Sequence, residues 1–117
     1  MALILDLTYF AVVVTAPTGV GSAVTLMSLI QAARPTSPIR NSCTVAQITA
    51  AKANTGTVWT GDNTLEGTTL TGVGIEMAAG EGYFEPWRGG GFGSIDLSQV
   101  YVQGSVASQK LLLRVWR

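Results

Sequence analysis

The chain is 117 residues long and carries seven basic and seven acidic side chains, so its formal net charge is zero. This length suits one domain (residues 1–117) with its own core, and the zero charge excludes a field that attracts nucleic acid or an anionic membrane, so neither is expected as a partner. Only 12% of the residues are charged, against about 25% in ordinary soluble domains. Such a surface is poorly protected against self-association, and we expect a homo-oligomer.

The N-terminal segment 1–17 is the most apolar run in the chain. It lacks the basic residues that open a signal peptide, because the first basic residue is Arg34, and Asp6 interrupts the apolar stretch. The residues from Tyr9 to Ala16 are too few for a bilayer span, which takes about 20. We therefore expect no targeting signal here and synthesis in the cytoplasm.

Residues 9–15 are β-branched and aromatic, which predicts a strand that is apolar on both faces. Such a strand either lies in the middle of a sandwich or turns its outer face to another subunit. This strand and the residues before it together form an apolar N-terminal arm, residues 1–16. Leu3, Leu5 and Leu7 alternate along one side of this arm and are candidate intersubunit contacts.

Residues 22–33 predict one short helix. Ser22 can cap its first turn, because a serine oxygen accepts from the free amides there. Four apolar residues recur at the spacing of one helical face, namely Leu26, Leu29, Ile30 and Ala33. Pro35 ends the helix. A strand over residues 23–30 is the alternative interpretation.

The segment 44–62 predicts a hairpin that turns at Asn54-Thr55-Gly56, because Asn and Gly tolerate the positive φ of tight turns. A further turn at Gly61-Asp62-Asn63 is expected to close its second strand. The glycine-rich stretch that follows, 62–83, predicts brief strands joined by tight turns, one of them at residues 79–82.

The segment 84–93 is rich in glycine yet contains three large aromatic residues. Glycines cannot hold a regular element, and exposed aromatic rings are costly, so we expect these rings to contact a neighbour. The candidate interface residues are Phe84, Trp87, Arg88 and Phe92, with Trp87 as the anchor, since Trp and Arg often dominate interface energies. The alternative is a loop that folds back over the domain's own core.

The C-terminal stretch predicts a second hairpin, with alternating strands on either side of a loop at residues 104–108. Leu112 and Trp116, on the face opposite the buried one, are more apolar than a solvent-facing side requires and are further interface candidates. About seven short strands and one helix predict an all-β fold, an antiparallel β-sandwich of the jelly-roll type.

The chain has no histidine and one cysteine, Cys43. Serine–histidine and cysteine–histidine nucleophile systems and zinc sites are therefore excluded, and we expect no enzyme activity, no metal and no cofactor. Cys43 is expected to be a small buried hydrophobe. Trp59, Trp87 and Trp116 leave open a second function class, a small carbohydrate-binding module that stacks sugars on its tryptophans.

Four segments together resemble small structural proteins of tailed bacteriophages: AKANTGTVWTGD (51–62), AAGE (78–81), IDLSQVYVQG (95–104) and SQKLLLRVW (108–116). In that family a strand ends in N-T-G and leads to V-Y-V-G-D, a G-E turn follows, and D-L-S-x-I-Y-V-x-G precedes the final strand. The chain departs from this pattern in having Trp59 in place of Tyr and in a glycine-rich insertion around residues 87–93.

The resemblance implies a non-enzymatic virion component that decorates or cements the head, or a minor head or tail protein. It implies contact with other virion proteins, above all the major capsid protein, and a location in the virion after synthesis in the host cytoplasm. The alternative class is the carbohydrate-binding module, as part of a receptor-binding apparatus. A glycan screen separates the two classes.

Overall fold

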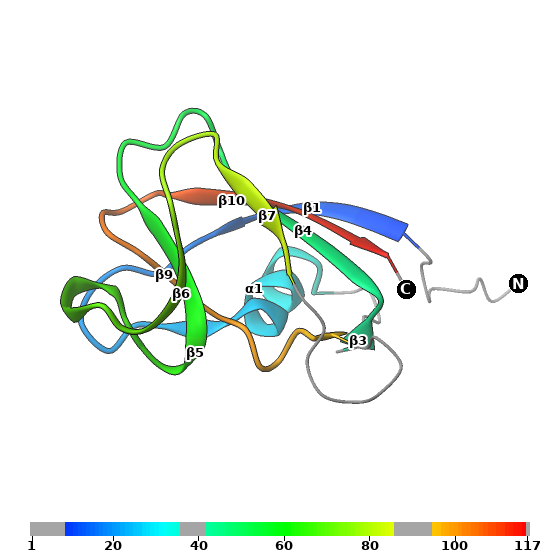
Figure 1. Cartoon of the computed structure of the whole chain (residues 1–117). Helices are drawn as coiled ribbons and strands as arrows, with labels where there is room; N and C mark the ends of the chain where they lie inside the picture. The colour runs from blue at the N-terminus through cyan, green and yellow to red at the C-terminus, as the bar shows by residue number, and fades with distance from the viewer. Residues whose placement is uncertain (1–8, 36–41, 86–94, 117) are drawn as a thin grey trace, which may run out of the picture.

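The computed structural model describes residues 9–35, 42–85 and 95–116 (Figure 1). The strands of this part are β1 (Tyr9–Thr15), β2 (Val24–Thr25), β3 (Ser42–Cys43), β4 (Val45–Ala50), β5 (Val58–Glu66), β6 (Thr71–Met77), β7 (Gly82–Phe84), β8 (Ile95–Asp96), β9 (Tyr101–Gly104) and β10 (Lys110–Trp116). One α-helix, α1 (Leu26–Ala33), and a 3-10 turn, η1 (Gly67–Thr69), complete it.

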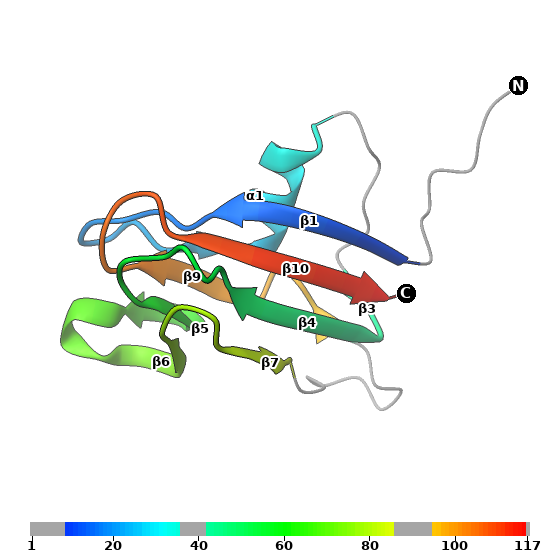
Figure 2. The ribbon, with the colours of Figure 1, turned by 90° about the horizontal axis from the view of Figure 1, so that it is seen from above.

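The strands form two four-stranded antiparallel sheets. The first sheet has the order β1-β10-β4-β7 and the second β2-β9-β5-β6, while β3 and β8 form a small pair of their own. In Figure 2 the strands of the first sheet run side by side, and β9, β5 and β6 form the layer beneath them. This architecture confirms the predicted all-β sandwich, with more strands in the described part than the seven expected.

The strand pairs follow one pattern, in which the first described strand pairs with the last, the second with the last but one, and so on inward. β1 pairs with β10, β2 with β9, β3 with β8, β4 with β7 and β5 with β6. The chain is therefore one long two-stranded antiparallel ribbon whose tip is the β5–β6 hairpin. The ribbon is rolled up so that β10 also pairs with β4 and β9 with β5. A ribbon rolled in this way is a jelly roll.

The two predicted hairpins are wrong, although their strands exist. β4 lies in the first sheet and β5 in the second, and the same holds for β10 and β9. The connections 51–57 and 105–109 therefore cross between the sheets and bind each other: the Gly56 amide donates to the Gln109 side chain at 2.8 Å, and the Ser105 amide donates to the Thr57 carbonyl at 2.9 Å. The Asn54 side chain bonds both the N–H and the C=O of Lys110, the first residue of β10, at 2.8 and 2.9 Å. The turn-forming Asn thus stabilises a crossing rather than a hairpin.

The predicted turn at residues 61–63 is also wrong, because β5 continues through it to Glu66. The ladder between β5 and β6 shifts its register at Gly61. A Cβ at Gly61 would lie 1.9 Å from the carbonyl oxygen of Gly72, so the close approach of the two backbones requires glycine here. The turn before Gly82 is present as predicted, with Gly80 at a φ of +84°.

The core lies between the two sheets and under α1. It is built from alternate residues of the strands, because successive side chains of a strand point to opposite faces. Its largest fully buried members include Leu26, Ile30, Ile48, Met77, Ile95, Leu97, Leu111 and Leu113. Cys43 is buried among them, as predicted.

The predicted helix is present but begins later than expected. Its N-cap is Thr25, whose hydroxyl accepts from the Ser28 amide at 3.1 Å, whereas the Ser22 hydroxyl donates to the Gly19 carbonyl. Residues 24–25 form the short strand β2, so the alternative of a strand over 23–30 holds only for those two residues. Of the predicted stripe, Leu26 and Ile30 are buried.

β1 has the predicted bounds, but it is an edge strand and not a central one. Its outward residues Tyr9 and Val13 are exposed. Arg34, just after α1, donates from Nη2 to the Ala11 carbonyl at 2.8 Å, and its guanidinium lies 5.3 Å from the centre of the Phe10 ring. A cationic side chain at this position hinders pairing of the edge with another strand.

The alternation along β10 gives a matched test of the fold. Leu113 is 2% exposed and its neighbour Leu112 is 42% exposed. We expect Leu113→Ala to lower the free energy of unfolding by about 2–5 kcal/mol, because it opens a cavity in the core. Leu112→Ala should cost less than about 1 kcal/mol. Urea denaturation measures both values, and equal losses would contradict the observed orientation of β10.

Candidate functional site

The outward face of the first sheet carries an unusual set of exposed apolar side chains, which we call the platform. The strand register places them in three rows: Tyr9–Trp116–Val45, Ala11–Arg114–Gln47–Phe84 and Val13–Leu112–Thr49. Five of its large hydrophobic residues are exposed, with Phe84 the most exposed at 61%. Several large apolar side chains exposed on one face of a sheet are typical of a contact site.

Arg114 is held at the centre of the platform. Its guanidinium carbon lies 5.0 Å from the centre of the Trp116 ring and 5.8 Å from that of Tyr9, and the two rings are 5.2 Å apart. Arg114 also donates to the Gln47 side chain at 3.3 Å and to the Tyr9 hydroxyl at 3.4 Å. In the part of the chain that the structure describes, no carboxylate pairs with it. The platform therefore presents the positive charge of the Arg114 guanidinium, held in place beside the Tyr9 and Trp116 rings and not neutralised by a carboxylate of the described residues.

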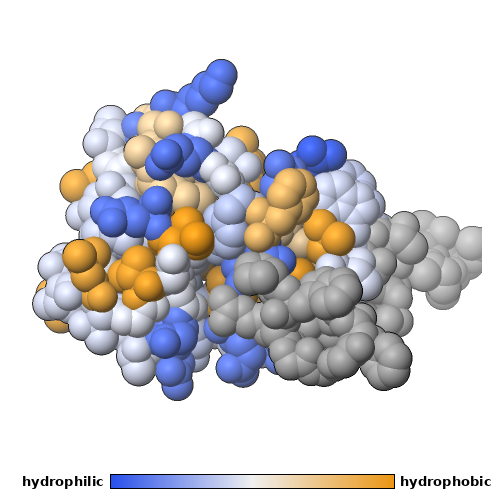
Figure 3. Space-filling view, viewed as in Figure 1, coloured by the Kyte–Doolittle hydropathy of each residue, from blue (hydrophilic) through white to orange (hydrophobic). Residues whose placement is uncertain are grey.

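A wide hollow of about 650 Å³ opens on the platform beside Arg114. It is lined by Thr44, Val45, Gln47, Phe84, Arg114 and Trp116. Figure 3 shows apolar side chains at the surface over β7, where the platform meets the edge of the sheet. The hollow combines apolar side chains with a few polar groups, a combination that is typical of ligand and protein recognition sites.

Three of the predicted contact residues meet on the platform: Phe84, Leu112 and Trp116. The other predicted residues, Leu3, Leu5, Leu7, Trp87, Arg88 and Phe92, lie outside the described residues. Tyr9, Val13, Val45 and Arg114 belong to the platform but were not predicted as contact residues. Their alternation was visible in the sequence, but only the pairing of β1 and β4 with β10 shows that they share one face.

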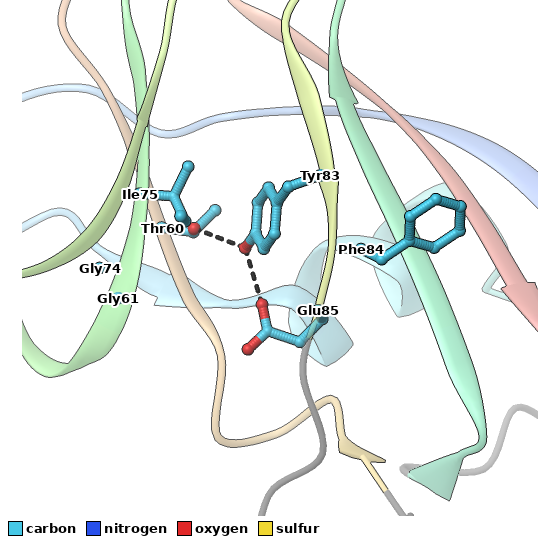
Figure 4. Close-up of a pocket in the computed structure, with 7 residues that line it drawn as sticks. All are labelled: Thr60, Gly61, Gly74, Ile75, Tyr83, Phe84 and Glu85. Carbon is cyan, nitrogen blue, oxygen red and sulfur yellow. Dashed lines mark hydrogen bonds between the residues drawn. The ribbon is translucent and has the colours of Figure 1, made fainter.

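A second, smaller pocket of about 370 Å³ lies where β7 faces β5 and β6 (Figure 4). The Tyr83 hydroxyl lies 2.6 Å from the Thr60 hydroxyl and donates to the buried Glu85 carboxylate at 2.7 Å. Phe84, between these two residues on β7, points the other way, onto the platform. The hydrogen bonds from Thr60 through Tyr83 to Glu85 connect β7 to β5 of the second sheet, and they thereby fix the position of Phe84.

Trp59 cannot stack on a ligand, because it is only 7% exposed. Its ring lies against Gly67, where a Cβ would come within 1.9 Å of it. Its indole nitrogen is buried and has no hydrogen-bond partner. Trp59 is therefore a packing residue that fixes η1 to the second sheet. It is not available for stacking on a sugar.

Glu66 fastens the loops that cover the second sheet. Its carboxylate accepts from the Gly21 amide at 2.9 Å and from the Thr68 hydroxyl at 2.8 Å. The buried Gln103 side chain donates to the same carboxylate and to the Gly19 carbonyl, and accepts from the Gly67 amide. These hydrogen bonds, that from Gly21 first, lower the pKa of the Glu66 carboxyl.

Comparisons with known proteins give no family for the chain. No protein-family model, curated protein or solved structure matches it. Among the described residues, no helix is long and apolar enough to cross a membrane, and no three His, Cys, Asp or Glu side chains gather as metal ligands. The platform and the sequence motifs are therefore the features that bear on function.

The Glu66 carboxyl provides a pH test of these loops. Its pKa in the folded state is lowered from about 4.5, so the ionised group stabilises the fold above that pH, and this contribution is lost as the pH falls through the folded pKa. We expect wild-type protein to lose stability below about pH 4.5 more steeply than Glu66→Gln. Urea denaturation of both proteins across this range measures the difference, and parallel profiles would contradict it.

Proposed function

We propose that this protein is a non-enzymatic structural component of a bacteriophage particle, most specifically a capsid decoration or cement protein, or a minor head or tail protein. It acts through protein–protein contacts made by the platform. The observation that carries the proposal is the exposed apolar face of the first sheet, with Arg114 held between the rings of Tyr9 and Trp116.

The composition of the platform suits a protein interface. Aromatic residues and arginine are enriched at interfaces and supply most of their hot spots. Tyr9, Trp116 and Arg114 are already packed against each other, so little side-chain entropy remains to be lost on docking. The exposed aliphatic residues Val13 and Leu112 pair directly across β1 and β10 and extend the apolar area.

The motifs that resemble phage structural proteins support the same proposal. Residues 51–62 lead from the crossing into β5, residues 95–104 cover β8 and β9, and residues 108–116 include all of β10. The last of these supplies Leu112, Arg114 and Trp116 to the platform. The partners we propose are other virion proteins, the major capsid protein first, and the location is the virion.

A carbohydrate-binding module is the second candidate, favoured by the hollow on the platform. Phe84 and Trp116 border it, and Gln47 and Arg114 offer polar groups to a hydroxyl-rich ligand. Trp59 is buried and weighs against this candidate. Trp116, the other tryptophan among the described residues, is only partly exposed, so a sugar finds less stacking surface than the sequence indicated.

Co-sedimentation with capsid shells tests the proposal. The shells are assembled from the major capsid protein encoded in the same genome, and the variants are Leu112→Asp on the platform and Val106→Asp in the loop between β9 and β10, where Val106 is 46% exposed. A charge buried without a partner in an interface is costly. We expect Leu112→Asp to weaken shell binding at least about tenfold, and Val106→Asp to leave it within about twofold.

Thermal melting of both variants controls for folding. Equal binding by the two variants would exclude the platform as the contact surface. Absence of shell binding by wild-type protein, together with glycan binding that Trp116→Ala abolishes, would replace the proposal with the carbohydrate-binding module.

A further inference from the structure

Although the formal net charge is zero, the described basic and acidic side chains are distributed unevenly over the sandwich. Lys110 and Arg114 both point outward from β10, Arg114 on the platform and Lys110 beside it in the next row, opposite Thr15. The described acidic residues lie elsewhere, on β5, β6 and β8 and next to the β6–β7 turn and β7: Asp62, Glu66, Glu76, Glu81, Glu85 and Asp96. None of them occupies an outward position on β1, β10, β4 or β7. Among the described residues, the outward face of the first sheet therefore carries only positive charge, whereas Asp62, Glu66 and Glu76 place negative charge on the second sheet.

The acidic side also exposes apolar side chains. Val20 is 84% exposed and Leu70, at the end of η1, is 64% exposed. Figure 3 shows apolar side chains at the surface at the end of the β5–β6 hairpin. Leu70 also adopts a left-handed conformation, with a φ of 58°, which is uncommon for a residue other than glycine, and such outliers cluster at functional sites.

Val20, Glu66, Leu70 and Glu76 form one surface, which we call the flank. Glu66 accepts from Gly21, the residue after Val20. η1, which follows Glu66 and precedes Leu70, lies on the Trp59 ring through Gly67. Trp59 in turn pairs with Glu76 across the β5–β6 ladder. The flank thus combines two carboxylates with two exposed aliphatic residues.

We infer that the platform of one copy of this chain binds the flank of a second copy, head to tail. This inference rests on the proposed use of the platform as a protein contact surface, and it makes a second copy and the shell alternative occupants of that surface. Charge decides the partner: Arg114 and Lys110 meet Glu66 and Glu76 across the contact, while the aliphatic residues of the two surfaces pack together. A contact between two platforms would instead bring the positive charges of both copies together, which disfavours it.

A head-to-tail contact has a consequence for assembly. The two surfaces of one copy are different, so each copy still has one free platform or one free flank after the first contact forms. Such heterologous contacts produce a ring when the rotation between copies closes and a filament when it does not. The inference therefore predicts oligomers larger than a dimer, whose strength falls with ionic strength.

Two charge-altered variants of the full chain test the inference. The first is Lys110→Glu/Arg114→Glu, which makes the platform negative. The second is Glu66→Gln/Glu76→Lys, which makes the flank positive and keeps an acceptor oxygen for the Gly21 amide. Each variant alone then sets like charges against each other across the contact. Sedimentation velocity over a concentration series measures self-association, and thermal melting confirms that both variants fold.

We expect each variant alone to associate at least about tenfold more weakly than wild type, and an equimolar mixture of the two to associate as wild type does, because each supplies the charge that the other needs. If two platforms contact each other instead, the second variant associates as strongly as wild type, and this result would overturn the inference. A monomeric wild type, or a mixture no stronger than its components, overturns it as well. If the inference fails in any of these ways but Leu112→Asp still abolishes shell binding, the proposed function stands.

Discussion

Pairing between the first and last strands of the sandwich is the contact on which the rest of the structure depends. β1 and β10 are in continuous register from Tyr9↔Trp116 to Thr15↔Lys110. This ladder pairs the first described strand with the last at the base of the rolled ribbon, and β10 then brings β4 and β7 into the same sheet. A slip of one residue would move every side chain of β10 to the opposite face, so the register decides both the core and the platform.

The platform follows from that register together with the composition of β10. Leu111 and Leu113 face the core, while Leu112, Arg114 and Trp116 face outward. A sheet in a sandwich needs only one apolar face, so the apolar residues on the outside do not contribute to the core. Arg114, fixed by two rings and one amide, gives this face its charge. An apolar face with a single sign of charge is suited to a partner with the opposite sign.

The sequence allowed the strands to be predicted more reliably than their pairing. The bounds of β1 and the presence of α1 follow from β-branched runs and helical spacing, which are local signals. The pairing in a rolled ribbon is not local, since β1 and β10 are about a hundred residues apart. The turn residues around Asn54 predicted a hairpin, yet the Asn54 side chain hydrogen-bonds the backbone of Lys110 at a crossing between sheets. Leu112 and Trp116 were identifiable from alternation alone, whereas Tyr9, Val13 and Arg114 required the register.

Nuclear Overhauser contacts in isotope-labelled protein test the rolled ribbon most directly. We expect contacts between the side chains of Val13 and Leu112 on the outside of the first sheet, and between the backbones of Val58 and Gly104 in the second. We expect no ladder of contacts between β4 and β5, because they lie in different sheets. Such a ladder, on either side of Asn54, would show that the segment is a simple hairpin after all and would contradict the arrangement of the platform.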